Sequence, residues 1–385
     1  MPRLADVVRR HGSAYVRRHR ASLLPSHTRA LQSIVHCRTP VMGGHVAVCS
    51  ACGTEHVLYH SCGHRACPQC GRGATTAWLA KQRELLLPVP YFHVVFTLPA
   101  ELRRLVRAHQ KVLVSVLFQA AFEALSTLAA DPHYLGADIG ALAVLHTSSR
   151  TLEWHPHVHM LVPGGGLAPD GRTWRSARRR RNGEPYLVPV KAVAERYRGR
   201  FLALARRALP GVHVPDVPWG KKWVVFAKPT VQGADKVLEY LGRYIHKTAI
   251  SDGAIVAFDE RSVTFRYRDS RDHRMKTMTL GPDEFLRRFL QHVLPRGLHR
   301  VRAFGLLHPA HRHTFRRLQL LLQSRTKAPV EPARPPRRRC PHCKNGELFT
   351  LYTISPAACI ELATAAQPCA IRSARAPPAT MTASA

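Results

Sequence analysis

The central part of the chain alternates short β-branched or aromatic runs with longer segments of helical periodicity. Residues 91–98 are rich in Val and Phe and end at Pro99, which is typical of a strand. Residues 142–147 and 154–162 predict two antiparallel strands joined by a short turn, and residues 255–280 predict a basic hairpin. Helices are expected at residues 101–129, 191–208, 235–248 and 283–294. The pattern predicts an α+β fold built on an antiparallel sheet.

Composition divides the chain of 385 residues into four regions. Residues 1–36 predict a basic helical lead-in, and residues 37–87 predict a small cysteine-rich module with a connector helix. Residues 88–325 carry the α+β pattern and form the expected main domain. Residues 326–385 predict a Pro- and Arg-rich linker, then a tail that is disordered past Leu351. This last region holds one partial knuckle, Cys340 and Cys343.

Histidine occupies every second position in part of the strand expected at residues 154–162. These residues are His155, His157 and His159, and side chains two positions apart on a strand share one face. The opposite face is apolar and suits a core, with Trp154, Val158, Met160 and Val162. Clustered imidazoles on a half-buried strand indicate a metal ion, because buried nitrogens need partners. The alternative is a chance cluster, since the chain has 24 histidines.

Two or three histidines leave coordination positions open for water or for a substrate oxygen. Imidazole favours Zn²⁺, Mn²⁺, Co²⁺ or Ni²⁺ over Mg²⁺ on ligand softness. Phosphate oxygens from a substrate would also allow Mg²⁺ or Mn²⁺ at such a site. The histidine row therefore predicts an open metal site of the kind that performs chemistry.

Cysteines gather in the module at residues 37–87. Two Cys-x-x-Cys knuckles, Cys49 with Cys52 and Cys67 with Cys70, are typical of a zinc ribbon with one structural Zn²⁺. The module is too short to build a core, so the metal would contribute to its folding. Nearby residues are further candidates, for a second site or for replacing one ligand: Cys37, Cys62, His60 and His64. The alternative is a set of buried cysteines without a metal.

The net charge is +34, with 58 Lys and Arg against 24 Asp and Glu. Such a surplus predicts a polyanionic partner, usually nucleic acid, with a membrane surface as the rival. The sequence contains no run of 18 uncharged apolar residues, so no membrane-spanning helix is predicted. Residues 1–20 lack the apolar run of a signal peptide, which predicts a cytoplasmic protein.

A basic loop is expected at residues 164–185. Its arginines are Arg172, Arg175, Arg178, Arg179, Arg180 and Arg181. Trp174 and Tyr186 lie close to them in sequence, and arginines interleaved with aromatic rings suit single-stranded DNA. The alternative is a solvated arginine run.

Two tyrosines lie one turn apart on the helix expected at residues 235–248. Tyr240 and Tyr244 share one side of that helix, and Arg243, His246 and Lys247 crowd the same segment. The cations would stabilise a nearby phosphate and lower the pKa of a phenol, which could then attack phosphorus. The alternative is a pair of tyrosines that pack with their hydroxyls in water.

These motifs resemble a known family. His157-Val158-His159 matches the histidine–hydrophobic–histidine (HUH) signature. The surrounding sequence resembles the two-tyrosine rolling-circle transposases of bacterial insertion sequences, the IS91 family. The matching segments are LHT (145–147), HPHVHMLVPGG (155–165), YLGRYIHKTAIS (240–251), KTMTL (276–280) and EFLRRFLQHVLPRGLHRVRAFG (284–305). The zinc module of the family is matched by HCRT (36–39), GGH (43–45) and SCGHRACPQC (61–70).

The resemblance implies a single-strand DNA endonuclease and strand transferase that moves an insertion sequence by a rolling-circle route in the bacterial nucleoid. His157 and His159 would bind a catalytic Mg²⁺ or Mn²⁺, and His155 or His246 would be the third ligand. Tyr240 and Tyr244 would be the nucleophiles, each forming a 5′-phosphotyrosine. The chain departs from the family at Ala66, where histidine is usual, and past residue 348, where the C-terminal ribbon looks unfinished.

Two other classes of protein remain open. One is a different HUH enzyme, such as a plasmid replication initiator or a relaxase, although the chain lacks a Gly-x-x-x-x-Gly-Lys-Ser/Thr loop of the helicase type. The other is a zinc-ribbon DNA-binding protein without enzymatic activity. A two-metal carboxylate transposase is set aside because the chain is poor in acidic residues.

Overall fold

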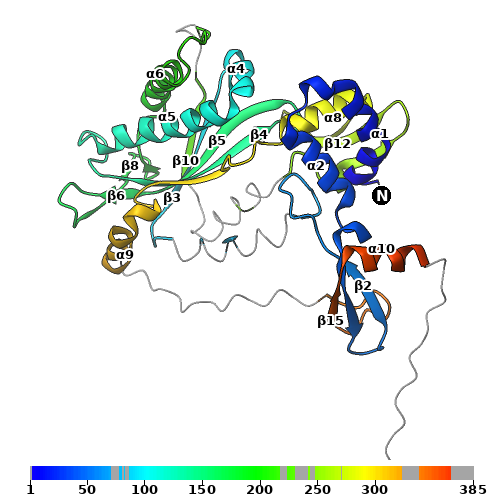
Figure 1. Cartoon of the computed structure of the whole chain (residues 1–385). Helices are drawn as coiled ribbons and strands as arrows, with labels where there is room; N and C mark the ends of the chain where they lie inside the picture. The colour runs from blue at the N-terminus through cyan, green and yellow to red at the C-terminus, as the bar shows by residue number, and fades with distance from the viewer. Residues whose placement is uncertain are drawn as a thin grey trace, which may run out of the picture.

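The fold is known from a computed structural model of the whole chain. It describes residues 2–70, 78, 79, 82, 86–216, 223–229, 242, 248–269, 271–322 and 338–365. Three groups of elements are distinguishable in Figure 1: a large sheet covered by helices, a smaller helix and strand group beside α8, and a small group around β2 and β15.

A five-stranded antiparallel sheet forms the centre of the largest group. Its strand order is β10 (Val225–Pro229), β3 (Tyr91–Thr97), β5 (Trp154–Pro163), β4 (Gly140–Ser148) and β14 (Val301–Gly305). Helices α4 (Arg103–Ala108), α5 (Gln110–Ala130) and α6 (Val190–Ala208) lie along it (Figure 1). The predicted α+β class with antiparallel pairing is confirmed, and β5 carries the histidine row at its expected place.

Strand β5 is buried on both faces, but the two faces differ in chemistry. Val158, Met160 and Val162 pack into the main core with α5 and α6, as their alternation predicts. Leu161 belongs to the opposite face, where it packs with Val144. Helix α5 is long and apolar enough to cross a membrane by length and composition, and no other described helix is. Its contacts with α6 and β5 show why a core helix has that composition.

The second group packs the N-terminal helices against residues 250–293, which are far away in the sequence. Helices α1 (Leu4–His19) and α2 (Pro25–His36) pack with α8 (Pro282–Gln291) and a three-stranded sheet. The strands of this sheet are β11 (Ile255–Phe258), β12 (Val263–Arg268) and β13 (Met275–Leu280), so the expected hairpin is a three-stranded meander. The helices expected as a lead-in are thus half of a core with residues 250–293.

The third group combines residues from both ends of the chain. Strand β1 (Gly44–Cys49) lies between β2 (Glu55–Tyr59) and β15 (Leu348–Ile354), and α10 (Pro356–Ala365) follows. The expectation of disorder past Leu351 is wrong as far as Ala365. Strand β15 is ordered because it pairs with one edge of β1 along its length, an interaction over about 300 residues of sequence.

The remaining described elements are short, apart from one helix. They are η1 (Arg20–Ser22), η2 (Pro40–Met42), η3 (Ala100–Leu102), β6 (Gly165–Leu167), β7 (Trp174–Ser176), β8 (Arg178–Arg179), β9 (Pro185–Tyr186), η4 (Asp252–Ala254), η5 (Pro309–His311) and α9 (Arg312–Leu321). The helix expected at residues 235–248 and most of the connector helix at 74–87 lie outside the described residues.

Candidate active site and metal centres

Three histidines from two neighbouring strands converge on one face of the large sheet. His146 of β4 lies directly across from His157 of β5, and their ring centroids are 5.3 Å apart. His159 completes the group, with its ring centroid 4.7 Å from that of His146. One ligand nitrogen from each of the three lies within 4.8 Å of the others. Three converging imidazoles fit a divalent metal ion with coordination positions left for a substrate.

Hydrogen bonds to the rings fix which nitrogen is available to a metal. His157 Nδ1 lies 2.7 Å from the carbonyl oxygen of His155, so Nδ1 carries the proton and Nε2 keeps its lone pair. His159 Nδ1 lies 2.8 Å from Nε2 of His93 on β3, and the two rings stack. Burial lowers the pKa of His93 to about 4, so its ring is neutral, and we assign the tautomer in which His159 Nδ1–H donates to His93, since this leaves His159 Nε2 as a lone-pair donor for a metal. Both strand histidines therefore present Nε2 to the site.

His155, one of the two candidates for the third ligand, is not part of this group, and the other candidate, His246, lies outside the described residues. Its ring lies beside that of His157, at 5.3 Å between centroids, but it contributes no nitrogen to the cluster. Burial and the charge of Arg103 lower its pKa to about 4. A β-bulge between His146 and Ser148 lies beside this end of β5, and bulges re-aim side chains locally. The third imidazole comes instead from β4, which only the strand register could reveal.

The predicted tyrosine nucleophiles, Tyr240 and Tyr244, lie outside the described residues, as do Arg243, His246 and Lys247. Gly242 within this segment and the residues from Thr248 onward are described. Gly242 approaches Leu79 so closely that a Cβ added there would lie 2.9 Å from a Leu79 methyl carbon. Thr248 and Ala249 line a small cavity together with Thr147 and His292. Thr248 and Ala249 therefore lie near Thr147, the residue that follows His146 in sequence.

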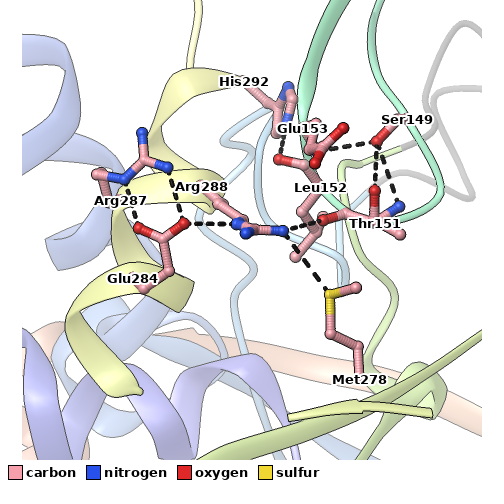
Figure 2. A network of polar contacts seen from close by, with 9 residues as sticks. All are labelled: Ser149, Thr151, Leu152, Glu153, Met278, Glu284, Arg287, Arg288 and His292. Atoms are coloured by element: carbon pink, nitrogen blue, oxygen red, sulfur yellow. Dashed lines mark hydrogen bonds and ion pairs between the residues drawn. The ribbon is translucent and has the colours of Figure 1, made fainter. Parts of the chain in front are cut away.

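The turn between β4 and β5 is held by a buried histidine of the second group (Figure 2). His292, which follows α8, lies 3.1 Å from the Leu152 carbonyl oxygen through Nε2. Its Nδ1 lies 3.1 Å from the Thr147 hydroxyl. A neutral ring meets both needs, because Nδ1 accepts from the hydroxyl and Nε2–H donates to the carbonyl. Thr147 follows His146 directly, so this contact anchors the strand beside the metal site.

Arg288 provides a second anchor for the same turn. It donates through Nη1 to the Thr151 carbonyl oxygen at 3.1 Å, and its Nε donates to Glu284 at 2.7 Å (Figure 2). Leu152 between these contacts has φ of +62° and is buried in the core of the second group. A leucine holds that left-handed conformation only when its surroundings determine it. The turn is therefore positioned by α8, a helix from another part of the sequence.

His292→Gln is expected to flatten the dependence of stability on acid pH. Burial lowers the pKa of His292 from 6.5 to about 4. Below pH 6.5 His292 is therefore protonated in the unfolded chain, whereas in the folded chain it stays neutral down to about pH 4. This residue alone costs up to roughly 3 kcal/mol of stability as the pH falls through that window. Glutamine can donate to Leu152 and accept from Thr147 without titrating. Denaturation midpoints at several pH values test this, and parallel curves for both proteins would contradict it.

Eight cysteines form two clusters rather than the single ribbon that the sequence predicts. The first contains Cys37, Cys62, Cys67 and Cys70, and the second contains Cys49, Cys52, Cys340 and Cys343. The expected grouping of Cys49 and Cys52 with Cys67 and Cys70 is therefore wrong. Within each cluster the ligand sulfurs lie within 4.8 Å of one another, as four thiolates around one ion require. His60 and His64 belong to neither cluster.

Each cluster holds one thiol that is acidic enough to ionise at neutral pH. A hydrogen bond from Cys67 is the main cause that lowers the pKa of Cys62 to about 5. In the second cluster, hydrogen bonding with Thr54 lowers the pKa of Cys52 to about 5. Thiolate is the form that binds a metal, so the donor sets of both clusters fit zinc.

The arginines of the predicted DNA-binding loop are exposed, but several already hydrogen-bond to the protein. Arg175 donates to the Gly136 carbonyl oxygen, Arg178 to those of Pro132 and His133, and Arg179 to that of Gly183. Arg180 lies over the ring of Tyr186, and Arg172 and Arg181 are exposed. Trp174 packs against the apolar cluster around Leu87 and Phe315 rather than standing free for a base. These residues lie at the end of the large sheet away from α8 (Figure 1).

The sheet, the histidine triad and the cysteine clusters define a metal-binding protein with an HUH-type nuclease site. Comparison with known proteins agrees: residues 140–314 match the family described as "Putative transposase", and residues 7–98 match "Transposase zinc-binding domain". "Putative transposase y4qJ" of Sinorhizobium fredii is 38% identical over 383 residues, covering 91% of this chain and 95% of the relative. "Transposase for insertion sequence element IS801" of Pseudomonas savastanoi pv. phaseolicola is 30% identical over 289 residues, covering 70% of this chain and 68% of the relative.

The chain belongs to the IS91 family of transposases and contains the zinc-binding domain of that family. The family assignment that the motifs suggested is thereby confirmed. No solved structure matches the chain. The zinc-binding match ends at residue 98, so it does not include Cys340 or Cys343.

Proposed function

We propose that this transposase cuts and rejoins single-stranded DNA at the histidine site through a tyrosine nucleophile. The observation that carries the proposal is the triad of His146, His157 and His159, with Nε2 of both strand histidines facing an open metal position. A site with three protein ligands leaves room for phosphate oxygens. Thr248 and Ala249, which follow the tyrosine segment in sequence, line a cavity with Thr147, and in this proposal the tyrosines act on a phosphate held at the histidine site.

The catalytic ion is Mg²⁺ or Mn²⁺ in this proposal, because both accept phosphate oxygens together with imidazole. When bound, it polarises the scissile phosphate and balances the negative charge that develops on it. The chain itself supplies the orientation. His93 and the His155 carbonyl hold the strand imidazoles in one tautomer, and His292 holds the strand that carries His146.

The phenol oxygen of Tyr240 or Tyr244 attacks the phosphorus of the scissile bond. The phenol gives up its proton as a bond forms from its oxygen to phosphorus, the bond from phosphorus to the 3′ oxygen breaks, and the 3′ oxygen takes up a proton. The product is a 5′-phosphotyrosine and a free 3′-hydroxyl, so the energy of the phosphodiester is retained for rejoining. The second tyrosine performs the same step on another strand, which supports rolling-circle movement of the element.

The other partners follow from charge and from the cysteine clusters. A net charge of +34 suits the backbone of single-stranded insertion-sequence ends and of target DNA. Both four-cysteine clusters hold structural Zn²⁺ in this proposal. The protein acts in the bacterial cytoplasm at the nucleoid, where these DNA strands are found.

Covalent capture tests the nuclease proposal. The full chain is incubated with Mn²⁺ and a labelled single-stranded oligonucleotide from an end of its own element, and the adduct is analysed by mass spectrometry. We expect an adduct on Tyr240 or Tyr244, its loss from the double variant Y240F/Y244F, and no change in the control Tyr134→Phe. Undiminished adduct in the double variant would show that the tyrosine assignment is wrong. No adduct with the unaltered protein would favour a protein that only binds DNA.

A further inference from the structure

A cavity of about 430 Å³ lies where the large sheet meets the second group of elements. Its wall includes four arginines and three ring side chains. They are Arg103, Arg104 and Arg107 on α4, Arg287 on α8, Tyr15 on α1, His27 on α2 and Trp154 at the start of β5. The volume falls within the usual range of ligand pockets, about 300–1,000 Å³. The nuclease chemistry proposed above does not use it.

Three of the four arginines of this cavity form no ion pair within the described part of the chain. Arg287 pairs with Glu284 at 2.6 Å, but Arg103, Arg104 and Arg107 form no ion pair with a carboxylate in the described ranges. Burial lowers the pKa of both Arg103 and Arg107, which shows that water solvates them poorly. Grouping like charges in a partly desolvated site costs free energy unless an anion binds there.

Three buried hydrogen-bond donors on the cavity wall also lack acceptors. Arg103 Nε, Trp154 Nε1 and His27 Nε2 are buried without a hydrogen-bond partner. His27 Nδ1 accepts from the backbone N–H of Leu24, and burial lowers the pKa of His27 to about 4. His27 is therefore neutral with its proton on Nε2, so all three orphaned groups are donors. Unsatisfied donors together with positive charge specify a ligand rich in acceptor oxygens, such as phosphate.

The position of the cavity connects it with the histidine triad. Trp154 lies three residues before His157 on β5, which is about 10 Å along a strand. Arg107 lies over the Trp154 ring at 5.5 Å from its centroid, and His292 stacks against that ring at 6.0 Å. Both ring contacts hold the indole in the cavity wall. The groups left to bind a ligand are the hydrogen-bond donors that lack a partner.

We infer that this cavity binds a nucleotide of the substrate strand next to the scissile phosphate, and that Arg103, Arg104 and Arg107 hold its backbone phosphate. The inference rests on the proposed action on single-stranded DNA. It assigns the main strand contact to this cavity rather than to the loop at residues 172–181. Three of the loop arginines, Arg175, Arg178 and Arg179, already donate to backbone carbonyls. In the cavity, Arg103 Nε, Trp154 Nε1 and His27 Nε2 have no hydrogen-bond partner.

Binding measured without divalent metal tests the inference. The full zinc-loaded chain is titrated against labelled oligothymidylate by fluorescence anisotropy at several salt concentrations. The double variant R103Q/R104Q is compared with R196Q/R207Q, which removes two exposed arginines from α6. We expect at least about tenfold weaker binding for the cavity variant and less than about threefold for the control. The slope of log K against log salt should fall by about 0.7 for each phosphate that the variant no longer neutralises.

The single variant Arg104→Gln separates lost binding from misfolding. This side chain is exposed, so its replacement leaves the core intact. Light-induced cross-linking from 5-iodouracil, placed at successive positions beside the cleavage site, should modify the peptide that contains Trp154. Equal binding by the cavity and control variants would overturn the inference. Failure of the nuclease proposal is distinct: the unaltered protein would then bind oligothymidylate through the cavity but form no tyrosine adduct.

Discussion

His146→Ala is expected to reduce metal-dependent DNA cleavage by at least about 100-fold, as much as His157→Ala. The reason is geometric: His146 supplies one of three nitrogens that lie within 4.8 Å of one another. With two imidazoles left, the site binds the ion weakly and no longer fixes it against the scissile phosphate. Adduct formation is measured as a rate over a range of Mn²⁺ concentrations. High Mn²⁺ should restore part of the activity, which separates weakened metal affinity from misfolding.

His155→Ala is the matched control for this prediction. The imidazole of His155 lies outside the triad, and its contribution is the backbone carbonyl that accepts from His157. Alanine keeps that carbonyl, so the rate of adduct formation should stay within about threefold of the unaltered protein. Full activity in His146→Ala together with inactivity in His155→Ala would restore the sequence-based choice of ligand.

Cys67→Ser is expected to release one zinc ion and unfold the second group of elements. Cys67 and Cys37 are buried in the core that also contains α1, α2 and α8. A structural zinc ion contributes about 10–16 kcal/mol in apparent binding free energy, which equals or exceeds the whole stability of most domains. The turn at Leu152 is buried in the same core, so cleavage should be abolished as well. Zinc content by mass spectrometry and thermal unfolding measure both effects.

The second cysteine cluster should respond differently. The double variant C340S/C343S should also release one zinc ion, but the core around Cys67 should keep its melting transition, because the two clusters share no ligand. Cys359→Ser is the control: this buried cysteine of α10 belongs to neither cluster, so both zinc ions should remain. Equal zinc content in C340S/C343S and in the unaltered protein would contradict the second site. A Cys67→Ser protein that melts normally would contradict the first.

Local pattern was sufficient to predict most of the elements. The alternation of Val158, Met160 and Val162 with histidines predicted both the strand β5 and its buried apolar face, because a strand has a period of two whatever it pairs with. Helical periodicity predicted α6 and α8 to within a few residues. Sequence also supplied the chemistry: imidazole and thiolate as metal ligands, and a charge of +34 as the sign of a polyanionic partner.

Contacts between separate segments of the chain were not predictable in the same way. His146 lies in a strand that was expected, but its role depends on the register that places it opposite His157. The knuckles at Cys49 and Cys340 join because β15 pairs with β1, and no local signal encodes a contact across that separation. The short spacing of Cys52 and Cys67 favoured the wrong grouping, since spacing measures distance along the chain and not in space.

The sequence by itself determined which candidate groups this transposase carries: a row of histidines on one strand, a pair of tyrosines, cysteine knuckles and a large positive charge. These follow from residue type and from periodicities of two and 3.6, which are local. The tertiary structure alone decided the third histidine, the division of eight cysteines into two clusters, and the arginine cavity beside Trp154. The third histidine depends on the register of two neighbouring strands. The cysteine clusters and the cavity depend on closing long loops, and that closure is fixed by packing of the whole chain rather than by any local pattern.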